Sequence, residues 1–351
     1  MRRLILLLIV FLVTGPLAAQ PARRLLFVVV PGSTSQVEYQ GVGILVFDID
    51  AGHKFLKRIP TWPVPAGQQP ENVRGVAANA RTGRLYVGTV KRLAAFDLAN
   101  GKIVWEKTYD GRCCDRIALS PDGATIYAPS FGTPKWYVID AERGDLVTTI
   151  GVPGYPRQTL FSRDGAHAFL AAWESSVLTV VETKTHRPVR EIGPFSSFVC
   201  PFTIDGKASR AFANVDGLVG FEVADLVTGL ILDRVVIEGY QMEAAGKFEC
   251  PSHGIALTPD ERELWVADGV DNRIHVFDAT TYPPVPATTI EVRAQPRWLA
   301  FGIDGRFAYP STGDVIDTRS KKVVATLEDE RGAFVHSETM IEMAVTAGRF
   351  D

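Results

Sequence analysis

Several features that mark other protein classes are scarce or missing in this sequence. Only four of its 351 residues are cysteine, which excludes a small scaffold held together by many disulfides. Basic residues do not exceed acidic ones, at 37 against 40 with a formal net charge of -3, so a nucleic-acid surface is disfavoured. No GxSxG, GxxxxGK[ST], HExxH or complete GxGxxG motif occurs, which removes support for serine hydrolase, nucleotide-binding and zincin functions.

Long hydrophobic runs are also lacking. The run at residues 4–13 has about ten apolar residues, whereas a membrane-spanning helix needs roughly 18 or more. Two arginines precede this run and small residues follow it up to Ala19, which is the pattern of a secretory signal peptide. We therefore expect residues 1–19 to be cleaved and residues 20–351 to form a single domain that is periplasmic or secreted, without a membrane span.

What the sequence does contain is an internal repeat. The segment PRQTLFSRDGAHAF at 156–169 matches PRWLAFGIDGRFAY at 296–309, with Pro, Arg, Phe, Asp, Gly and Ala in the same places. An apolar strand, a tight turn and a second apolar strand recur in four further segments, and Asp-Gly between apolar runs is typical of a hairpin. The sequence thus predicts six such inner hairpins.

A second hairpin follows each of these and also occurs once before the first. It is an apolar strand that ends in an acidic residue, then a polar turn and another β-rich run, which gives seven outer hairpins. The acidic markers lie 39 to 56 residues apart, close to the spacing of four-stranded propeller blades. They are Asp48, Asp97, Asp140, Glu182, Glu222, Asp278 and Asp317.

The mismatch between six inner and seven outer hairpins predicts how the ring closes. One strand, at residues 25–30, precedes the first outer hairpin, and an unpaired apolar stretch at residues 339–345 follows the last. We expect this last stretch to complete the first blade, because closure protects the exposed edges of sheets. The predicted fold is an all-β, seven-bladed propeller with four-stranded antiparallel blades and few helices.

These blades resemble the YVTN-type β-propeller repeat, in which an apolar inner strand, Ser-Pro-Asp-Gly, a second apolar strand and a strand ending in Ile-Asp follow one another. The best matches are IALSPDGATIYAPS at 117–130 with WYVID at 136–140, and the segment 253–278. The blade at 200–238 departs from the pattern. The resemblance implies an exported propeller related to seven-bladed lactonases, and it leaves the chemistry open.

Counting back from the Asp-Gly turns predicts which residues enter the inner strands and so surround the mouth of the central channel. Three arginines crowded together need an anionic ligand, or carboxylates such as Asp115 and Glu338, to compensate their charge. A propeller in which each arginine binds only a backbone carbonyl of the next blade is the structural alternative. The predicted ring is Arg74, Asp115, Arg157, Phe198, His253, Arg297 and, by similarity of FVHSE to PSHGI, His336.

Two histidines of this ring, His253 and His336, are candidates for a general base, a metal ligand or an anion contact. Loop carboxylates that could approach His253 are Glu174, Asp268 and Asp271. The other four histidines fall in outer turns or on strands and have ordinary explanations. A metal site needs three or four convergent ligands, so we expect no metal and no cofactor.

The cysteines and one insertion also fall near the predicted mouth. A disulfide from Cys250 to Cys113 or Cys114 is possible in an oxidising compartment, whereas adjacent cysteines rarely pair and could simply be small buried residues. Residues 239–249 lengthen the connection into the strand that carries His253. This insertion could be a lid with Tyr240 and Phe248, or a tolerated loop.

The sequence leaves three functions open. The first is a monomeric binding module that takes a small anionic molecule or a protein segment at Arg74, Asp115, Arg157 and Arg297. The second is a lactonase-like hydrolase or lyase for a carboxylated sugar or lactone, in which His253 or His336 moves a proton while Arg157 and Arg297 hold a carboxylate. The third is a metal-dependent redox protein.

Overall fold

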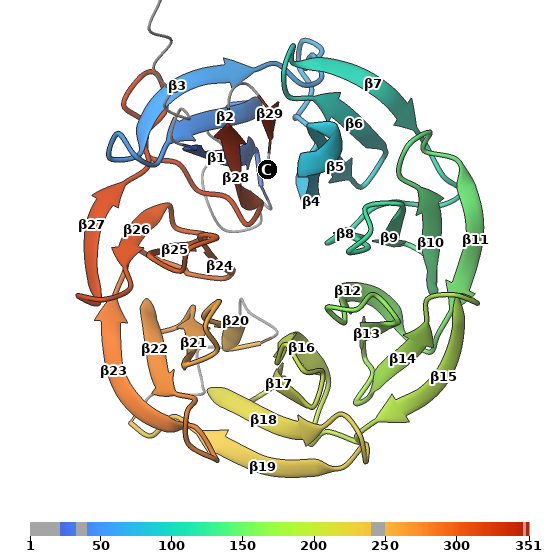
Figure 1. The fold of residues 1–351 in the computed structure, drawn as a ribbon, viewed down its shortest axis with the longest axis vertical. Helices are drawn as coiled ribbons and strands as arrows, with labels where there is room; N and C mark the ends of the chain where they lie inside the picture. Colours follow the sequence, from blue (N-terminus) through green and yellow to red (C-terminus); the bar gives the residue numbers. More distant parts are fainter. Residues whose placement is uncertain (1–21, 33–40, 240–249, 347–348, 351) are drawn as a thin grey trace, which may run out of the picture.

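The computed structural model describes residues 22–32, 41–239, 250–346 and 349–350. It shows seven β-sheets arranged in a ring around a central axis (Figure 1). The predicted signal peptide at 1–19 and most of the predicted lid at 239–249 lie outside the described residues. We name the seven sheets blades A to G in chain order.

Blade A contains strands from both ends of the chain, whereas blades B and C are each continuous in sequence. Blade A consists of β1 (Arg23–Val30), β2 (Gly43–Asp48), β3 (Lys54–Ile59), β28 (Met340–Thr346) and β29 (Arg349–Phe350). Blade B consists of β4 (Val73–Asn79), β5 (Arg84–Thr89), β6 (Leu93–Asp97) and β7 (Lys102–Lys107). Blade C consists of β8 (Ala118–Leu119), β9 (Thr125–Pro129), β10 (Lys135–Asp140) and β11 (Leu146–Gly151).

The other four blades are continuous in sequence. Blade D consists of β12 (Tyr155–Phe161), β13 (His167–Trp173), β14 (Leu178–Glu182) and β15 (Arg187–Ile192). Blade E consists of β16 (Val199–Ile204), β17 (Arg210–Val215), β18 (Gly220–Asp225) and β19 (Ile231–Val236). Blade F consists of β20 (Ser252–Leu257), β21 (Glu263–Asp268), β22 (Arg273–Asp278) and β23 (Val285–Glu291). Blade G consists of β24 (Leu299–Phe301), β25 (Phe307–Pro310), β26 (Asp314–Asp317) and β27 (Lys322–Thr326).

The ring closes as the sequence predicts. Strand β28, near the C-terminus, pairs antiparallel with β1, and Phe27 lies opposite Ile341 in this register. The backbone N–H of Val29 also donates to the carbonyl of Thr339 at 3.0 Å. The short strand β29 adds a fifth strand to this blade beside β28. Blade A therefore joins the two ends of the chain.

The apolar core lies between neighbouring blades, and this position determines which residues of each strand are buried. Tyr127 and Trp136 of blade C, for example, pack in one buried cluster with Leu170 of blade D. A middle strand such as β2 is buried along its whole length because both of its faces touch another blade. The outermost β15 is exposed at five of its six residues. Each large apolar side chain that is fully buried stabilises the fold by about 1.5–3 kcal/mol.

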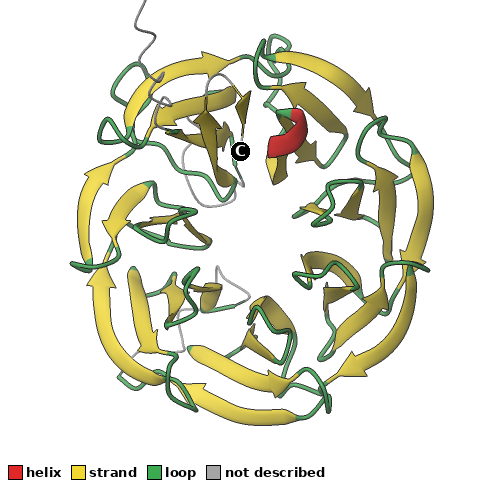
Figure 2. Cartoon of the chain, viewed as in Figure 1, coloured by secondary structure: helices red, strands yellow, loops and turns green. Residues whose placement is uncertain are grey.

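The ends of the inner strands farther from the predicted ring residues carry the Asp-Gly turns. The hydroxyl of Ser120 donates to the Asp122 carboxylate at 2.6 Å, and Gly123 has a φ of 72°, a conformation that glycine adopts without strain. Figure 2 shows that strands and loops make up nearly all of the described chain. The one helical turn in these residues is the 3-10 segment η1 (Ala80–Thr82).

Two histidines in outer turns connect neighbouring blades at the turn end. Nε2 of His53, in the turn of blade A, lies 3.0 Å from the Tyr309 hydroxyl of blade G. In the same way Nδ1 of His186, in the turn of blade D, lies 2.7 Å from the Tyr127 hydroxyl of blade C. These histidines occupy the tight outer turns that the sequence predicts, and they also bind the preceding blade.

Candidate functional site

Three of the predicted ring residues occupy β-bulges in the inner strands. The strand pairing shifts its register around one residue near the start of each strand, and that residue is Arg74 in β4, Arg157 in β12 and His253 in β20. A bulge leaves the extra residue outside the regular ladder and redirects its side chain. The same device in blades B, D and F thus sets these side chains apart from the alternating pattern of their strands.

A continuous series of polar contacts joins charged side chains from five blades. Arg74 Nε lies 3.4 Å from Asp115 Oδ1, and the other oxygen of Asp115 lies 3.1 Å from Arg116 Nη1. Arg116 Nη2 and Arg297 Nε each lie 3.3 Å from one oxygen of Glu338. Arg297 Nη2 also lies 3.0 Å from His253 Nε2. We call this group the mouth cluster, and its members, with Arg157 included, are Arg74, Asp115, Arg116, Arg157, His253, Arg297 and Glu338.

Positive charge exceeds negative charge in the mouth cluster. Four guanidinium groups lie against two carboxylates, and the side chains of Arg116, Arg297 and Glu338 are only 10–15% exposed. An arginine side chain stays charged at every physiological pH. Poor solvation and crowding of like charges together favour the entry of an anion.

The Asp115 carboxylate is held in its charged form by this surplus of cations. Burial opposes its ionisation, but Arg116, Arg74 and Arg157 together outweigh burial and lower the pKa of Asp115 below its ordinary value. The residue is 2% exposed, so its charge depends on these partners and not on water. Asp115 therefore acts as the fixed counter-charge of the cluster.

His253 is the neutral member of the mouth cluster. Burial, followed by the charges of Arg297, Arg157 and Arg116, lowers the pKa of His253 well below its ordinary value. Because a guanidinium only donates hydrogen bonds, Nε2 of His253 accepts from Arg297, and the ring proton lies on Nδ1. The lone pair that a general base would use is thus already engaged by a cation.

A cavity of about 350 Å³ lies along the channel beside the cluster. Its walls come from inner strands of several blades and include Arg74, Arg116, Gln158, Trp298 and Glu338. The guanidinium of Arg116 lies over the Trp298 ring, with its carbon 4.9 Å from the ring centroid. Aromatic rings of this kind hold a guanidinium in place without neutralising it.

Aromatic side chains support two more arginines of the cluster. The guanidinium carbon of Arg157 lies 4.4 Å from the centroid of Trp173. Arg74 and Arg112 both lie 4.7 Å from the centroid of Phe131. The rim of the channel is therefore built from stacked arginine and aromatic side chains, which keep the positive charges fixed in position.

The disulfides differ from the pairing considered in the sequence analysis. Cys250 is bonded to Cys200, and Cys113 is bonded to its neighbour Cys114. The bond from Cys250 to Cys113 or Cys114, which the sequence left open, does not form, because Cys200 in β16 lies beside Cys250 in the fold. The expectation that adjacent cysteines stay unpaired was wrong. Since its sulfur is bonded to Cys200, Cys250 is not a thiolate ligand for a metal in this state.

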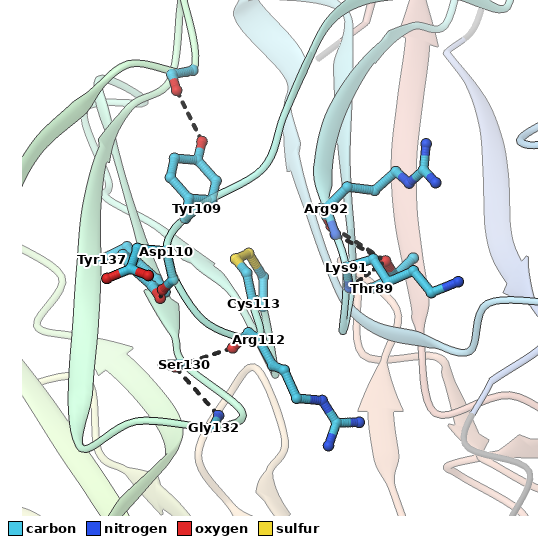
Figure 3. Close-up of a disulfide and its surroundings, with 12 residues drawn as sticks. Thr89, Lys91, Arg92, Tyr109, Asp110, Arg112, Cys113, Ser130, Gly132 and Tyr137 are labelled. Carbon is cyan, nitrogen blue, oxygen red and sulfur yellow. Dashed lines mark hydrogen bonds between the residues drawn. A yellow bond between two sulfur atoms is a disulfide. The ribbon is translucent and has the colours of Figure 1, made fainter.

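The Cys113–Cys114 disulfide lies directly before Asp115, between blades B and C (Figure 3). Both cysteines are fully buried, and the Arg112 carbonyl beside them accepts a hydrogen bond from the Ser130 hydroxyl at 3.0 Å. The backbone N–H of Asp115 donates to the carbonyl of Pro129 at 3.0 Å. The segment that presents Asp115 and Arg116 is therefore held rigidly from both sides.

The structure brings most of the predicted ring residues to one place. Arg74 contacts Asp115, and Arg297 contacts His253. Arg157 is close enough to act electrostatically on Asp115 and His253. Glu338 compensates the charge of arginines at the mouth, in the role for which the sequence offered it. Phe198 is 41% exposed and lines a smaller hollow with Arg157. His336 is half-buried and lies two residues before Glu338 in the chain. The contacts with the arginines of the mouth cluster described above are made by Glu338.

Two findings at this rim did not follow from the sequence. Arg116 belongs to the cluster although it follows Asp115 directly, and its φ of 31° is the reason, since this turn of the backbone ends the alternation of side chains. Asp268, considered as a partner of His253, instead lies 3.2 Å from Nε2 of His275. The only advance signal for Arg116 was a second charge next to a ring position.

The described residues also bear on metal binding and on membrane insertion. In this part of the chain no three side chains of His, Cys, Asp or Glu lie together as a metal site would require. None of the described helical segments is long and apolar enough to cross a membrane.

Comparisons with known proteins support the fold. No family model matches the chain, and no curated protein matches it. Among solved structures, the chain is similar to dihydro-heme d1 dehydrogenase NirN in complex with DHE, with a TM-score of 0.63, 16% sequence identity and coverage of 90% of this chain. The match covers 66% of the length of the NirN chain. At this identity the similarity shows a shared propeller fold, and the seven-bladed, all-β architecture predicted from the repeats is confirmed.

Proposed function

We propose that this propeller is a binding module whose channel mouth takes a small molecule with at least two negative charges, carboxylates above all. The observation that carries the proposal is the imbalance of the mouth cluster, in which three guanidiniums share two carboxylates and the charge of Arg157 also acts on Asp115, beside a cavity of about 350 Å³. A dianion would neutralise the surplus. Planar guanidiniums bind carboxylates through two parallel hydrogen bonds, which suits carboxylates better than a spherical ion.

The charges are also preorganised for such a ligand. Trp298, Trp173 and Phe131 hold the guanidiniums in place before anything binds, so little side-chain entropy is lost on binding. NirN, which shares the fold, has been solved in complex with DHE. This supports the use of a propeller as a ligand-binding scaffold and says nothing about which ligand this chain takes.

Export is part of the same proposal. The leader pattern at residues 1–19 and the two disulfides both fit an oxidising compartment such as the periplasm or the cell exterior. We expect the mature protein to act there as a monomer, without a cofactor.

The alternative is a lactonase-like hydrolase or lyase with His253 or His336 as the base. The geometry of His253 favours binding over proton transfer, because its lone pair accepts from Arg297 and its pKa is held low. An acidic segment of a protein partner is a second possible occupant of the same mouth. Both alternatives use the same cations and differ in what happens after the anion arrives.

A thermal-shift screen of the purified protein tests the proposal. The panel holds succinate, glucuronate, a phosphosugar, a sugar lactone and, as an uncharged control, succinamide, and elemental analysis of the same sample reports any bound metal. We expect succinate or glucuronate at millimolar concentration to raise the melting temperature by about 2–4 °C, and succinamide to leave it unchanged. The proposal fails if no anion stabilises the protein more than succinamide does. Release of hydroxy acid from the lactone would support the enzyme instead.

A further inference from the structure

Next to the channel lies a second, smaller hollow of about 180 Å³, formed by blades D and E and the end of the connection into blade F. Trp173, Phe198, Val199 and the Cys200–Cys250 disulfide give it largely apolar walls. Its charged groups are Arg157 and Asp216. Of the mouth cluster, only Arg157 lines this hollow.

The size of this hollow matches one aromatic ring. An apolar cavity of about 150 Å³ engineered into another protein stays dry and binds benzene. Phe198 leaves 41% of its surface exposed at the rim, although burial of a phenylalanine side chain is favourable. A flat apolar ligand would cover this exposed ring and fill the space between the disulfide and Trp173.

Arg157 connects the hollow with the channel. It lines the hollow, it stacks on Trp173 at 4.4 Å, and it acts electrostatically on Asp115 and His253 of the mouth cluster. A ring in the hollow would thus have a cation at the edge that faces the channel. A carboxylate attached to that ring would reach Arg157 and the remaining surplus of positive charge.

We infer that the hollow is a subsite for the aromatic ring of an aryl carboxylate, whose carboxylate group lies on Arg157 at the border of the mouth cluster. This inference rests on the proposed anion-binding function and narrows its ligand class. Asp216 is the one carboxylate among the described residues of the lining, so it weakens such a ligand. Its replacement by asparagine is therefore expected to tighten binding.

Calorimetric titration with benzoate, acetate, benzyl alcohol and succinate tests the subsite. We expect benzoate to bind at least about tenfold more tightly than acetate, because covering one ring is worth more than about 1.4 kcal/mol. Benzyl alcohol has the ring without the charge and should bind at least about tenfold more weakly than benzoate. Succinate reports on the mouth cluster alone.

Two alanine variants locate the ring. Phe198→Ala should weaken benzoate about tenfold and leave succinate unchanged. Tyr282→Ala is the matched control, because Tyr282 is 42% exposed and also carries a stacked arginine, Arg210 at 4.3 Å, but does not line the hollow. It should change neither ligand. Asp216→Asn should tighten benzoate about two- to fivefold without affecting succinate.

Each other outcome has a definite meaning. If succinate binds but benzoate binds no better than acetate, the subsite is overturned while the proposed function stands. If no anion binds, both are overturned. Equal binding of benzyl alcohol and benzoate would leave an apolar hollow without the role given to Arg157, and this also overturns the inference. If Phe198→Ala does not fold, nuclear Overhauser contacts of the benzoate ring in the unmodified protein locate the ligand. Contacts with Trp173 are expected, and contacts with Trp298 would contradict the inference.

Discussion

At the turn end of the inner strands three aspartates, Asp122, Asp164 and Asp260, are satisfied by a hydroxyl two residues earlier. At the mouth end, charged side chains reach across to other blades. Asp122 and Asp260 each accept from the hydroxyl two residues earlier, Ser120 or Thr258, at 2.6 Å. These hydroxyl groups lower the pKa of both carboxyls. At the mouth, by contrast, Glu338 lies against Arg116, which is 222 residues away in the chain.

This difference shows which charges are free to act on a ligand. The Asp122 carboxylate stabilises its own turn, because its partners are the Ser120 hydroxyl and the backbone N–H of Ala124. The mouth cluster gathers one or two charged groups from each of several blades, so its net charge is a property of the closed ring. Repetition therefore builds the turn end, and departures from repetition build the site.

The largest expected effect separates the two ends directly. Asp115→Asn leaves Arg74 and Arg116 without their buried counter-charge, and we expect it to lower the free energy of unfolding by about 3–5 kcal/mol. Asp122→Asn in an exposed turn should cost less than about 1 kcal/mol. Urea unfolding of both variants measures this. Equal losses would show that the mouth cluster is not a coupled unit.

The disulfides provide the next test. Cys200 and Cys250 are 50 residues apart, so replacing both by serine should lower the free energy of unfolding by about 2–4 kcal/mol, because their bond restricts the unfolded chain. Cys113 and Cys114 are neighbours, and their bond closes almost no loop. Replacing Cys113 and Cys114 by serine should lower the free energy of unfolding by less than replacing Cys200 and Cys250 does, in the same unfolding experiment. The reverse order would contradict this account.

The response of stability to pH tests the turn end. Burial, with a contribution from Arg24, lowers the pKa of His53 to about 4. Between about pH 6.5 and 4 the unfolded chain therefore binds a proton that the folded chain does not, and stability falls as the pH falls, by on the order of 2 kcal/mol. His53→Gln keeps a polar partner for Tyr309 but does not titrate. Unfolding followed at several pH values should show a shallower slope for this variant, and an unchanged slope would remove His53 as the cause.

The smallest expected effect is a shift in one histidine. Because cations contribute to the low pKa of His253, a bound anion such as succinate should raise it, while the pKa of His53 at the opposite end should not move. NMR titration of the histidine ring protons, with and without succinate, reports both residues in one sample. A shift of both histidines, or of His53 alone, would place the anion elsewhere.

The sequence predicts the architecture well for a physical reason. Duplicated blades tend to keep their turn residues, so Asp-Gly turns mark four of the six inner hairpins and acidic strand ends mark the outer ones. The leftover stretch at 339–345 identifies the closing strand. Counting from these turns also locates Arg74, Arg157 and Arg297 at one rim. This works because all inner strands start at the same end of the ring.

The rest of the site depends on geometry that residue order does not contain. Arg116 joins the cluster through an unusual φ of 31°, which no motif announces. The pairing of Cys200 with Cys250 depends on a distance across two blades. Arg157, near the start of β12, stacks on Trp173, at the end of the paired strand β13. Only the register of these two strands reveals this contact. Spacing thus predicts the positions, whereas contacts between blades determine the chemistry.

The affinity for succinate of two arginine variants tests the central claim most directly. Arg297→Gln removes one guanidinium of the mouth cluster, and Arg262→Gln removes one at the turn end, where it lines a separate hollow. Calorimetric titration should show succinate binding weakened at least about tenfold by Arg297→Gln, and unchanged within about twofold by Arg262→Gln. Equal weakening by both variants, or undiminished binding to Arg297→Gln, would contradict a ligand site at the channel mouth.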